Sequence, residues 1–138
     1  MGNRTSEHLL PGAIYSRKDL RKQFYIEDAT LNNGVYRPSG FKSIWLFITE
    51  NKPADRTPYD DSLLRDELRW DGQLAGRTDH LIVDHAAEGN ELLVFYRRWK
   101  DEHPGFGFRF EGRFEYVSHK PGIPVQRKPS NFILRRCR

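Results

Sequence analysis

Two aromatic residues and a pair of carboxylates lie within one short stretch in the middle of the chain. Tyr59, Asp60 and Asp61 precede Trp70, and Gly72 closes the set. An aromatic ring can stack on a nucleobase, and a carboxylate can accept a hydrogen bond from its exocyclic amine. The set therefore predicts a pocket for a flipped base, with Tyr59 and Trp70 as stacking faces and Asp61 or Asp60 as the acceptor. The alternative is a core tryptophan on a strand beside an ordinary polar loop.

Basic and polar residues on either side of this stretch could contact the rest of a nucleic acid. Arg17, Lys18 and Arg21 fall on one short predicted helix and could bind phosphates. A solvated helix face is the alternative. Gln73 and Arg77 lie in a glycine-bounded stretch, and either side chain could enter the gap that a flipped base leaves. A simple connector would have the same composition.

Charge is distributed unevenly along the chain. The net charge is +4, but residues 50–91 carry 11 acidic and 5 basic side chains, whereas residues 92–138 carry 11 basic and 4 acidic ones. Residues 120–138 have six basic side chains, Arg127 and Lys128 among them, and no acidic one. A one-sided basic surface is typical of a protein that binds a polyanion, although a solvated tail is the simpler alternative.

Composition limits the class of protein. A chain of 138 residues with 37% hydrophobic and 30% charged residues predicts one globular domain, here 12–138, after a flexible leader at 1–11. The apolar runs are too short to span a bilayer, so we expect no membrane partner and a cytoplasmic location. The lone Cys137 and the poorly spaced His80 and His85 predict no metal site, and we expect no cofactor.

The pattern of apolar residues and turn signals predicts a mostly β fold. Ser16 and Asp19 have the spacing of a capping box, so a helix is expected over 16–24. Glycines near 106–112 mark a bend in a strand or strand pair. The predicted elements are helices at 16–24 and 81–87 and strands at 43–49, 67–70, 92–99 and 106–117. Together they predict an α+β domain, a small curved β-barrel with one or two short helices.

The order of several motifs resembles that of a known family. The motifs are Tyr59-Asp60-Asp61, Trp70-Asp71-Gly72, residues 84–95, residues 110–117 and the opening at residues 14–20. In this order they resemble SRA-type domains, the SET- and RING-associated readers of methylated DNA in the PUA-like superfamily. The opening looks like the start of the SRA-like domains attached to bacterial HNH restriction endonucleases. The resemblance extends over roughly residues 12–119.

The resemblance implies roles for single residues. Tyr59 and Trp70 would sandwich the base, and Asp61 would hold its Watson–Crick edge, with Asp60 as the competing assignment. The acidic loop is one residue shorter than in eukaryotic relatives, and Thr78-Asp79 replaces the family's Gly-Asn pair. The long finger that reads the opposite strand has no counterpart here.

The resemblance also implies a function. It predicts recognition of 5-methylcytosine or 5-hydroxymethylcytosine in duplex DNA by base flipping, as the targeting module of a modification-dependent restriction system. The domain itself would not be an enzyme, and a fused or partner HNH-type nuclease domain would cut. Two alternatives stay open: a PUA-like module that binds modified or single-stranded RNA, and a metal-dependent nuclease using Asp60, Asp61 and Glu67.

Overall fold

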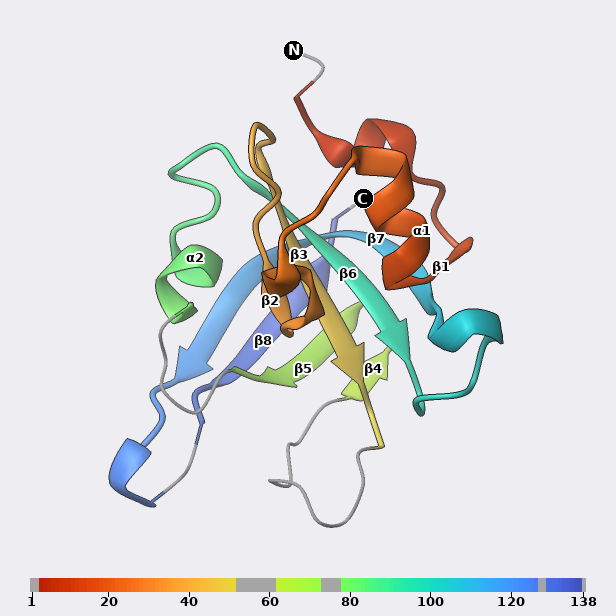
Figure 1. The fold of residues 1–138 in the computed structure, drawn as a ribbon. Coiled ribbons are helices and arrows are strands. Elements are labelled where there is room, and N and C mark those ends of the chain that lie inside the picture. Colours follow the sequence, from red (N-terminus) through yellow and green to blue (C-terminus); the bar gives the residue numbers. More distant parts are fainter. Residues whose placement is uncertain (1–2, 52–61, 73–77, 127–128, 138) are drawn as a thin grey trace.

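The computed structural model of the chain describes residues 3–51, 62–72, 78–126 and 129–137 (Figure 1). Two α-helices, eight strands and four 3-10 turns follow one another in this part of the chain. The helices and 3-10 turns are η1 (Thr5–His8), α1 (Arg17–Phe24), η2 (Ala29–Asn32), α2 (Asp79–Val83), η3 (Pro104–Phe106) and η4 (Pro124–Gln126). The strands are β1 (Ile14–Tyr15), β2 (Val35–Tyr36), β3 (Ser43–Thr49), β4 (Ser62–Leu64), β5 (Glu67–Asp71), β6 (Glu91–Arg97), β7 (Phe108–Lys120) and β8 (Asn131–Arg136).

The strands form one curled sheet. Their order is β2-β3-β6-β7-β8-β5-β4, and β1 pairs with β7. The β3–β6 pair is parallel, with Thr49 opposite Arg97, and the other pairs are antiparallel. Among the described residues the order runs from β2 to β4 without returning to β2, so the sheet curls without closing into a barrel. The prediction of a small, mostly β domain with short helices is confirmed.

A bulge in β7 helps the sheet to curl. The register between β6 and β7 shifts so that Val94 faces Gly112 and Phe95 faces Phe110, which leaves Glu111 as the extra residue. Gly112 has a φ of 91°, a conformation that glycine adopts without strain. The bulge also reverses the alternation of side chains along β7. Phe110 therefore packs on one face of the sheet and Phe114 on the other.

Both faces of the central strands are buried. Ile44, Leu46 and Ile48 lie in the core inside the curl, while Trp45 and Phe47 lie in the core on the outer face. Helix α1 covers this outer face beside β6 (Figure 1) and adds Leu20 and Phe24 to its core. A strand buried on both sides shows no apolar–polar alternation, which explains the continuous apolar run at 43–49.

The structure confirms the predicted start of the first helix but gives the second helix different ends. Helix α1 has the predicted cap, in which Ser16 Oγ accepts from the Asp19 amide at 3.0 Å and the Ser16 amide donates to Asp19 at 2.9 Å. Helix α2 begins before the predicted 81–87 and ends at Val83, followed by turns to Gly89. Beyond its end, His85 bonds to strand neighbours, Nδ1 to the Asn90 carbonyl at 2.9 Å and Nε2 to the Tyr116 amide at 3.3 Å.

The N-terminal stretch that was predicted as a flexible leader over 1–11 packs against the sheet from residue 3 onward. Thr5 is fully buried, accepts from Trp45 Nε1 at 2.8 Å and donates its amide to Ser43 Oγ at 3.0 Å. Leu9 joins the outer core. The N-terminal segment thus provides hydrogen-bond partners for the indole of Trp45 and the hydroxyl of Ser43. No helix in the described ranges has the length and apolar character needed to cross a membrane.

Candidate nucleic-acid interface

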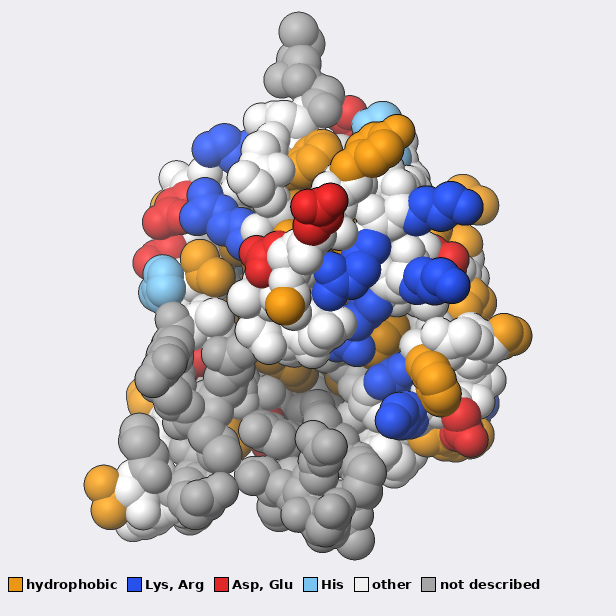
Figure 2. Space-filling model, viewed as in Figure 1, with side chains coloured by type: hydrophobic (Ala, Val, Ile, Leu, Met, Phe, Trp, Pro, Cys, Tyr) orange, Lys and Arg blue, Asp and Glu red, His pale blue; other side chains and the backbone are white. Residues whose placement is uncertain are grey.

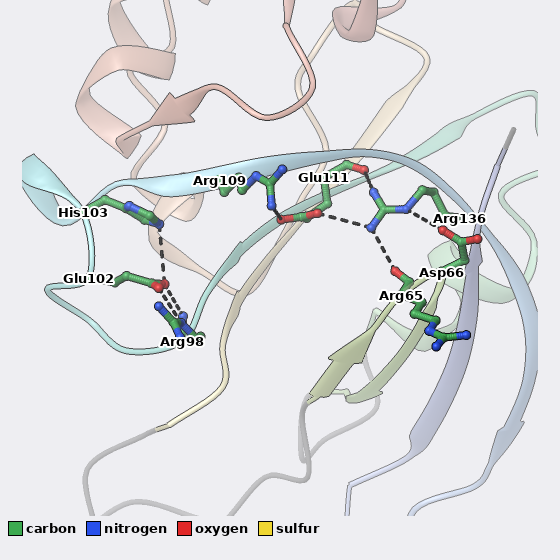
Figure 3. Close-up of polar contacts among 8 residues, drawn as sticks. All are labelled: Arg65, Asp66, Arg98, Glu102, His103, Arg109, Glu111 and Arg136. Atoms are coloured by element: carbon green, nitrogen blue, oxygen red, sulfur yellow. Dashed lines mark hydrogen bonds and ion pairs between the residues drawn. The ribbon is translucent and has the colours of Figure 1, made fainter.

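A hollow of about 440 Å³ lies between the β4–β5 hairpin and the turn that joins β6 to β7. We call it the Arg136 hollow. Its lining residues are Leu63, Arg65, Tyr96, Arg98, Glu102, His103, Arg109, Glu111 and Arg136. Four of the nine are arginines, and they come from segments that are far apart in the sequence. Figure 3 shows two groups of polar contacts here, one around Glu102 and one around Arg136.

Arg136 is the central residue of this hollow. Its Nε contacts Asp66 Oδ1 at 3.1 Å, and its Nη2 contacts Glu111 Oε1 at 3.3 Å and the Arg65 carbonyl at 3.1 Å (Figure 3). Its Nη1 donates to the Glu111 carbonyl, and the guanidinium lies 5.0 Å from the centre of the Phe114 ring. These bonds tie β8 to the bulge in β7 and to the β4–β5 turn.

A second group in the Arg136 hollow centres on Glu102. Its carboxylate accepts from Arg98 Nε at 2.6 Å and from the Arg98 amide at 2.7 Å, and His103 Nε2 lies 3.5 Å away (Figure 3). Burial opposes ionisation, but the bonds from Arg98 and the charges of Arg98 and His103 lower the pKa of Glu102 below its usual 4.5. Glu102 is thus ionised at neutral pH and holds Arg98 in place.

Two arginines of the Arg136 hollow are less engaged. Arg109 Nη1 is 3.8 Å from Glu111, at the limit of an ion pair, and Arg109 is exposed. Arg65 is exposed in the β4–β5 turn with a φ of 56°, and no carboxylate of the described residues pairs with it. Exposed guanidiniums can bind phosphate or a base edge.

The predicted base pocket is placed only in part. Tyr59, Asp60 and Asp61 lie outside the described residues, so their role stays a prediction. Trp70 lies on β5, is 4% exposed, and packs against Phe132 with ring centres 5.5 Å apart in the inner core. The structure thus gives Trp70 the core contacts of the simpler alternative, and its stacking on a base also stays a prediction.

The Arg136 hollow adjoins the ends of the segment that carries the predicted pocket. Before that segment, Glu50 accepts a hydrogen bond from the Tyr96 hydroxyl, and after it Leu63 lines the hollow. Beyond Trp70, Gly72 fits closely against α2 and β8: a Cβ there would be 2.8 Å from Asp79 Oδ1 and 3.1 Å from Phe132 Cε2. The chain near both ends of the predicted pocket is therefore well fixed.

The three residues of α1 that were predicted to contact phosphates all lie within the described residues. Lys18 is exposed, and Arg21 donates to the Asp28 carbonyl at 2.9 Å. Arg17 is partly buried and donates to the Leu31 carbonyl at 3.0 Å. Burial and the charges of Arg97 and Arg21 lower the pKa of Arg17 to about 10.

The other predicted contacts, Gln73, Arg77, Arg127 and Lys128, lie outside the described residues. Lys and Arg side chains gather on the right-hand side of the face that carries α1, as Figure 2 shows. Within the ranges that the structure describes, no group of three or more His, Cys, Asp or Glu side chains could hold a metal ion.

The sequence did not indicate the Arg136 hollow. Its members come from β4–β5, β6–β7 and β8, and only the sheet order brings them together. The sequence indicated only that Arg98, Arg109 and Arg136 belong to the basic C-terminal part of the chain, not that they lie together.

Comparisons with known proteins show that the fold of this chain occurs in a solved structure. No family model matches the chain, and no curated protein matches it. Among solved structures, a "Modification dependent TagI restriction endonuclease" aligns over 93% of this chain with 18% identity and a TM-score of 0.56. The two share a fold. This chain covers 50% of the TagI chain, so it spans about half the length of that protein. A second structure, "DNA modification-dependent restriction endonuclease AspBHI", aligns over 94% of this chain and 77% of its own, with 15% identity and a TM-score of 0.42.

Proposed function

We propose that this chain recognises modified cytosine, 5-methylcytosine or 5-hydroxymethylcytosine, in duplex DNA. It would serve as the SRA-like targeting module of a modification-dependent restriction system. The observation that carries the proposal is the fold shared over 93% of the chain with about half of an endonuclease whose name includes modification dependence. The ordered motifs from residue 14 to residue 117 support it independently of that comparison.

In this proposal the modified base leaves the duplex and stacks between Tyr59 and Trp70, and Asp61 or Asp60 accepts from its amine. Flipping costs a few kcal/mol, and stacking returns about 1–3 kcal/mol per base. Contacts to phosphates must supply the rest. Because Trp70 is only 4% exposed, the side chains packed on it must shift before a base can reach the ring.

The Arg136 hollow adds to the proposal. It lies next to both ends of the segment that holds Tyr59, and its exposed Arg65 and Arg109 can meet a phosphate or a base edge. An arginine rim beside a base pocket would hold the duplex while one nucleotide is drawn out. The chain itself would not cleave DNA, and a nuclease domain, fused or separate, would do so.

A competition titration tests this function. A labelled duplex with one modified cytosine is bound, and unlabelled modified duplex, unmodified duplex, single-stranded DNA and single-stranded RNA are added in turn. We expect the modified duplex to compete best. RNA as the strongest competitor would favour the RNA-binding alternative and contradict the proposal.

The same protein preparation tests the absence of catalysis. Incubation of modified and unmodified plasmid with Mg²⁺ or Mn²⁺ should leave both uncut. Nicking that disappears in Asp60→Ala would instead support the metal-dependent nuclease.

A further inference from the structure

A second hollow, of about 260 Å³, lies on the outer face of the sheet between α1 and the β6–β7 turn. We call it the Arg97 hollow. Its lining residues are Arg17, Lys18, Arg97, Lys100, Gly105 and Phe106. Four of the six carry a positive charge, and none carries a negative one. Arg97 and Lys100 are not among the DNA contacts predicted from the sequence.

The side chain of Arg97 is buried and hydrogen-bonded to its neighbours. Arg97 is the last residue of β6 and only 8% exposed. Its Nε donates to Thr49 Oγ1 at 2.8 Å, and its Nη1 donates to the carbonyls of Lys100 at 3.1 Å and Phe106 at 2.7 Å. Its Nη2 donates to no atom of the described residues. The guanidinium is therefore held in orientation through Nε and Nη1, and the contacts made within the described residues leave Nη2 for a ligand.

Arg17 and Arg97 share one aromatic ring. The guanidinium carbon of Arg97 lies 4.0 Å from the centre of Phe108, and that of Arg17 lies 5.0 Å from the same centre. Arg17 also lies 4.5 Å from the centre of Phe47. Cation–π contacts partly compensate two like charges held this close, but they do not neutralise them.

This group of charges has no acidic partner among the residues that the structure describes. No ion pair joins Arg17, Lys18, Arg97 or Lys100 to a carboxylate within the described part of the chain. The nearest acid on α1, Asp19, is occupied by the Ser16 cap. By contrast, Arg98 and Arg136 in the Arg136 hollow are paired with Glu102, Asp66 and Glu111. Buried charges are normally paired, so a buried arginine that finds no carboxylate among the described residues points to an anion supplied from outside.

We infer that the Arg97 hollow binds a backbone phosphate of the nucleic acid. The Nη2 of the fixed Arg97 guanidinium can donate to a phosphate oxygen, and the lysines at the rim add charge without requiring one geometry. Lys100 Nζ lies 5.3 Å from the centre of the Phe106 ring, which is 57% exposed at the same rim. The inference rests on the proposed function, because it assumes that DNA is the ligand.

The place of the hollow suits this role. Arg97 pairs with Thr49 at the end of β3, three residues before the segment that carries Tyr59 of the predicted base pocket and lies outside the described residues. Arg98, the next residue, lines the Arg136 hollow. The two hollows thus lie on opposite faces of the same end of the sheet. A duplex bound at this end could contact both.

Salt dependence of binding tests the inference with matched variants. Lys18→Ala with Lys100→Ala removes two exposed charges from the Arg97 hollow. Arg37→Ala with Lys42→Ala removes two exposed charges at the start of β3, the opposite end of the strand. The first double variant should reduce the slope of log affinity against log salt by about 1, because the two lysines no longer contribute to neutralising that phosphate. It should weaken modified and unmodified duplexes by the same factor, and the control should leave the slope as in wild type.

Equal slopes in the two double variants would overturn the inference, whatever the preference for modified DNA. Absence of that preference in wild type would instead overturn the proposed function and leave the slope comparison valid. Arg97→Lys, which keeps the charge but removes the fixed Nη2 donor, should weaken binding while the protein stays folded by circular dichroism.

A direct readout covers the case in which no duplex binds. The Nε–H NMR signals of Arg17 and Arg97 should shift when a single-stranded oligonucleotide is added. A shift with inorganic phosphate but not with the oligonucleotide would assign the hollow to a small free anion and contradict a backbone site. No shift with either would remove the site altogether.

Discussion

At the residue scale, the proposed function and the structure place Trp70 in different environments. The proposed function requires its ring to be accessible to a base, whereas the structure buries the ring against Phe132. We expect Trp70→Ala to lower the free energy of unfolding by about 3–5 kcal/mol, the usual cost of removing a buried aromatic ring. Urea unfolding followed by circular dichroism measures it. Trp70→Phe keeps a ring and should cost less, so it is the better variant for binding assays. An unchanged urea midpoint in Trp70→Ala would contradict the core placement.

Tyr59→Ala tests the other proposed stacking face. It should cost about 1–3 kcal/mol of binding to modified duplex DNA, the contribution of one base–aromatic stack. Unmodified duplex, held mainly through its phosphates, should bind almost as well as to wild type. Equal weakening for the two duplexes, measured by anisotropy, would remove Tyr59 from the pocket.

Glu102 makes stability depend on pH. Its pKa is lower in the folded protein than the ordinary 4.5, so its contribution is present above about pH 4.5 and is lost as the pH falls through the lowered value. Unfolding by urea at several pH values between about 6 and 3 should show a smaller decrease in stability in Glu102→Gln than in wild type. Glu88→Gln, an exposed residue in the turn after α2, is the control. Identical acid profiles for all three proteins would contradict the Arg98–Glu102 contact.

At the scale of elements, the fit of β5 against α2 depends on Gly72. A Cβ at this position would come 2.8 Å from Asp79 Oδ1. The other oxygen of this carboxylate, Oδ2, accepts from Ser130 Oγ at 2.6 Å, so the Asp79 side chain cannot move away without losing that hydrogen bond. We expect Gly72→Ala to destabilise the fold by about 1–3 kcal/mol. Gly34→Ala, where the added Cβ would lie 3.8 Å from the Phe47 carbonyl, should be nearly neutral. Thermal unfolding of the two variants compares them, and equal midpoints would contradict the close fit.

The elements also show what the sequence could and could not predict. The cap of α1 and the strands around 43–49, 67–70 and 92–99 follow from local residues, and the structure contains them. Strand β8 was missed because its basic residues suggested a tail, although Phe132 and Leu134 enter the inner core. The Arg136 hollow could not be predicted, because its shape depends on sheet order and on the Glu111 bulge.

At the scale of the whole molecule, the proposed function requires a polyanion to contact the basic groups of both hollows at one end of the sheet. We expect log affinity for duplex DNA to fall by about 0.9 per unit of log salt for each phosphate neutralised. Anisotropy titrations at several salt concentrations give the slope. A nearly flat response would mean that the basic residues of both hollows serve the folded structure alone.

The central claim is that this fold reads a modified base. Two labelled duplexes, identical except for one 5-methylcytosine or 5-hydroxymethylcytosine, are titrated with wild-type protein at the same salt concentration. We expect the modified duplex to bind about tenfold to a hundredfold more tightly, the range for a base held by aromatic stacking. Equal affinity for modified and unmodified duplexes would contradict the claim.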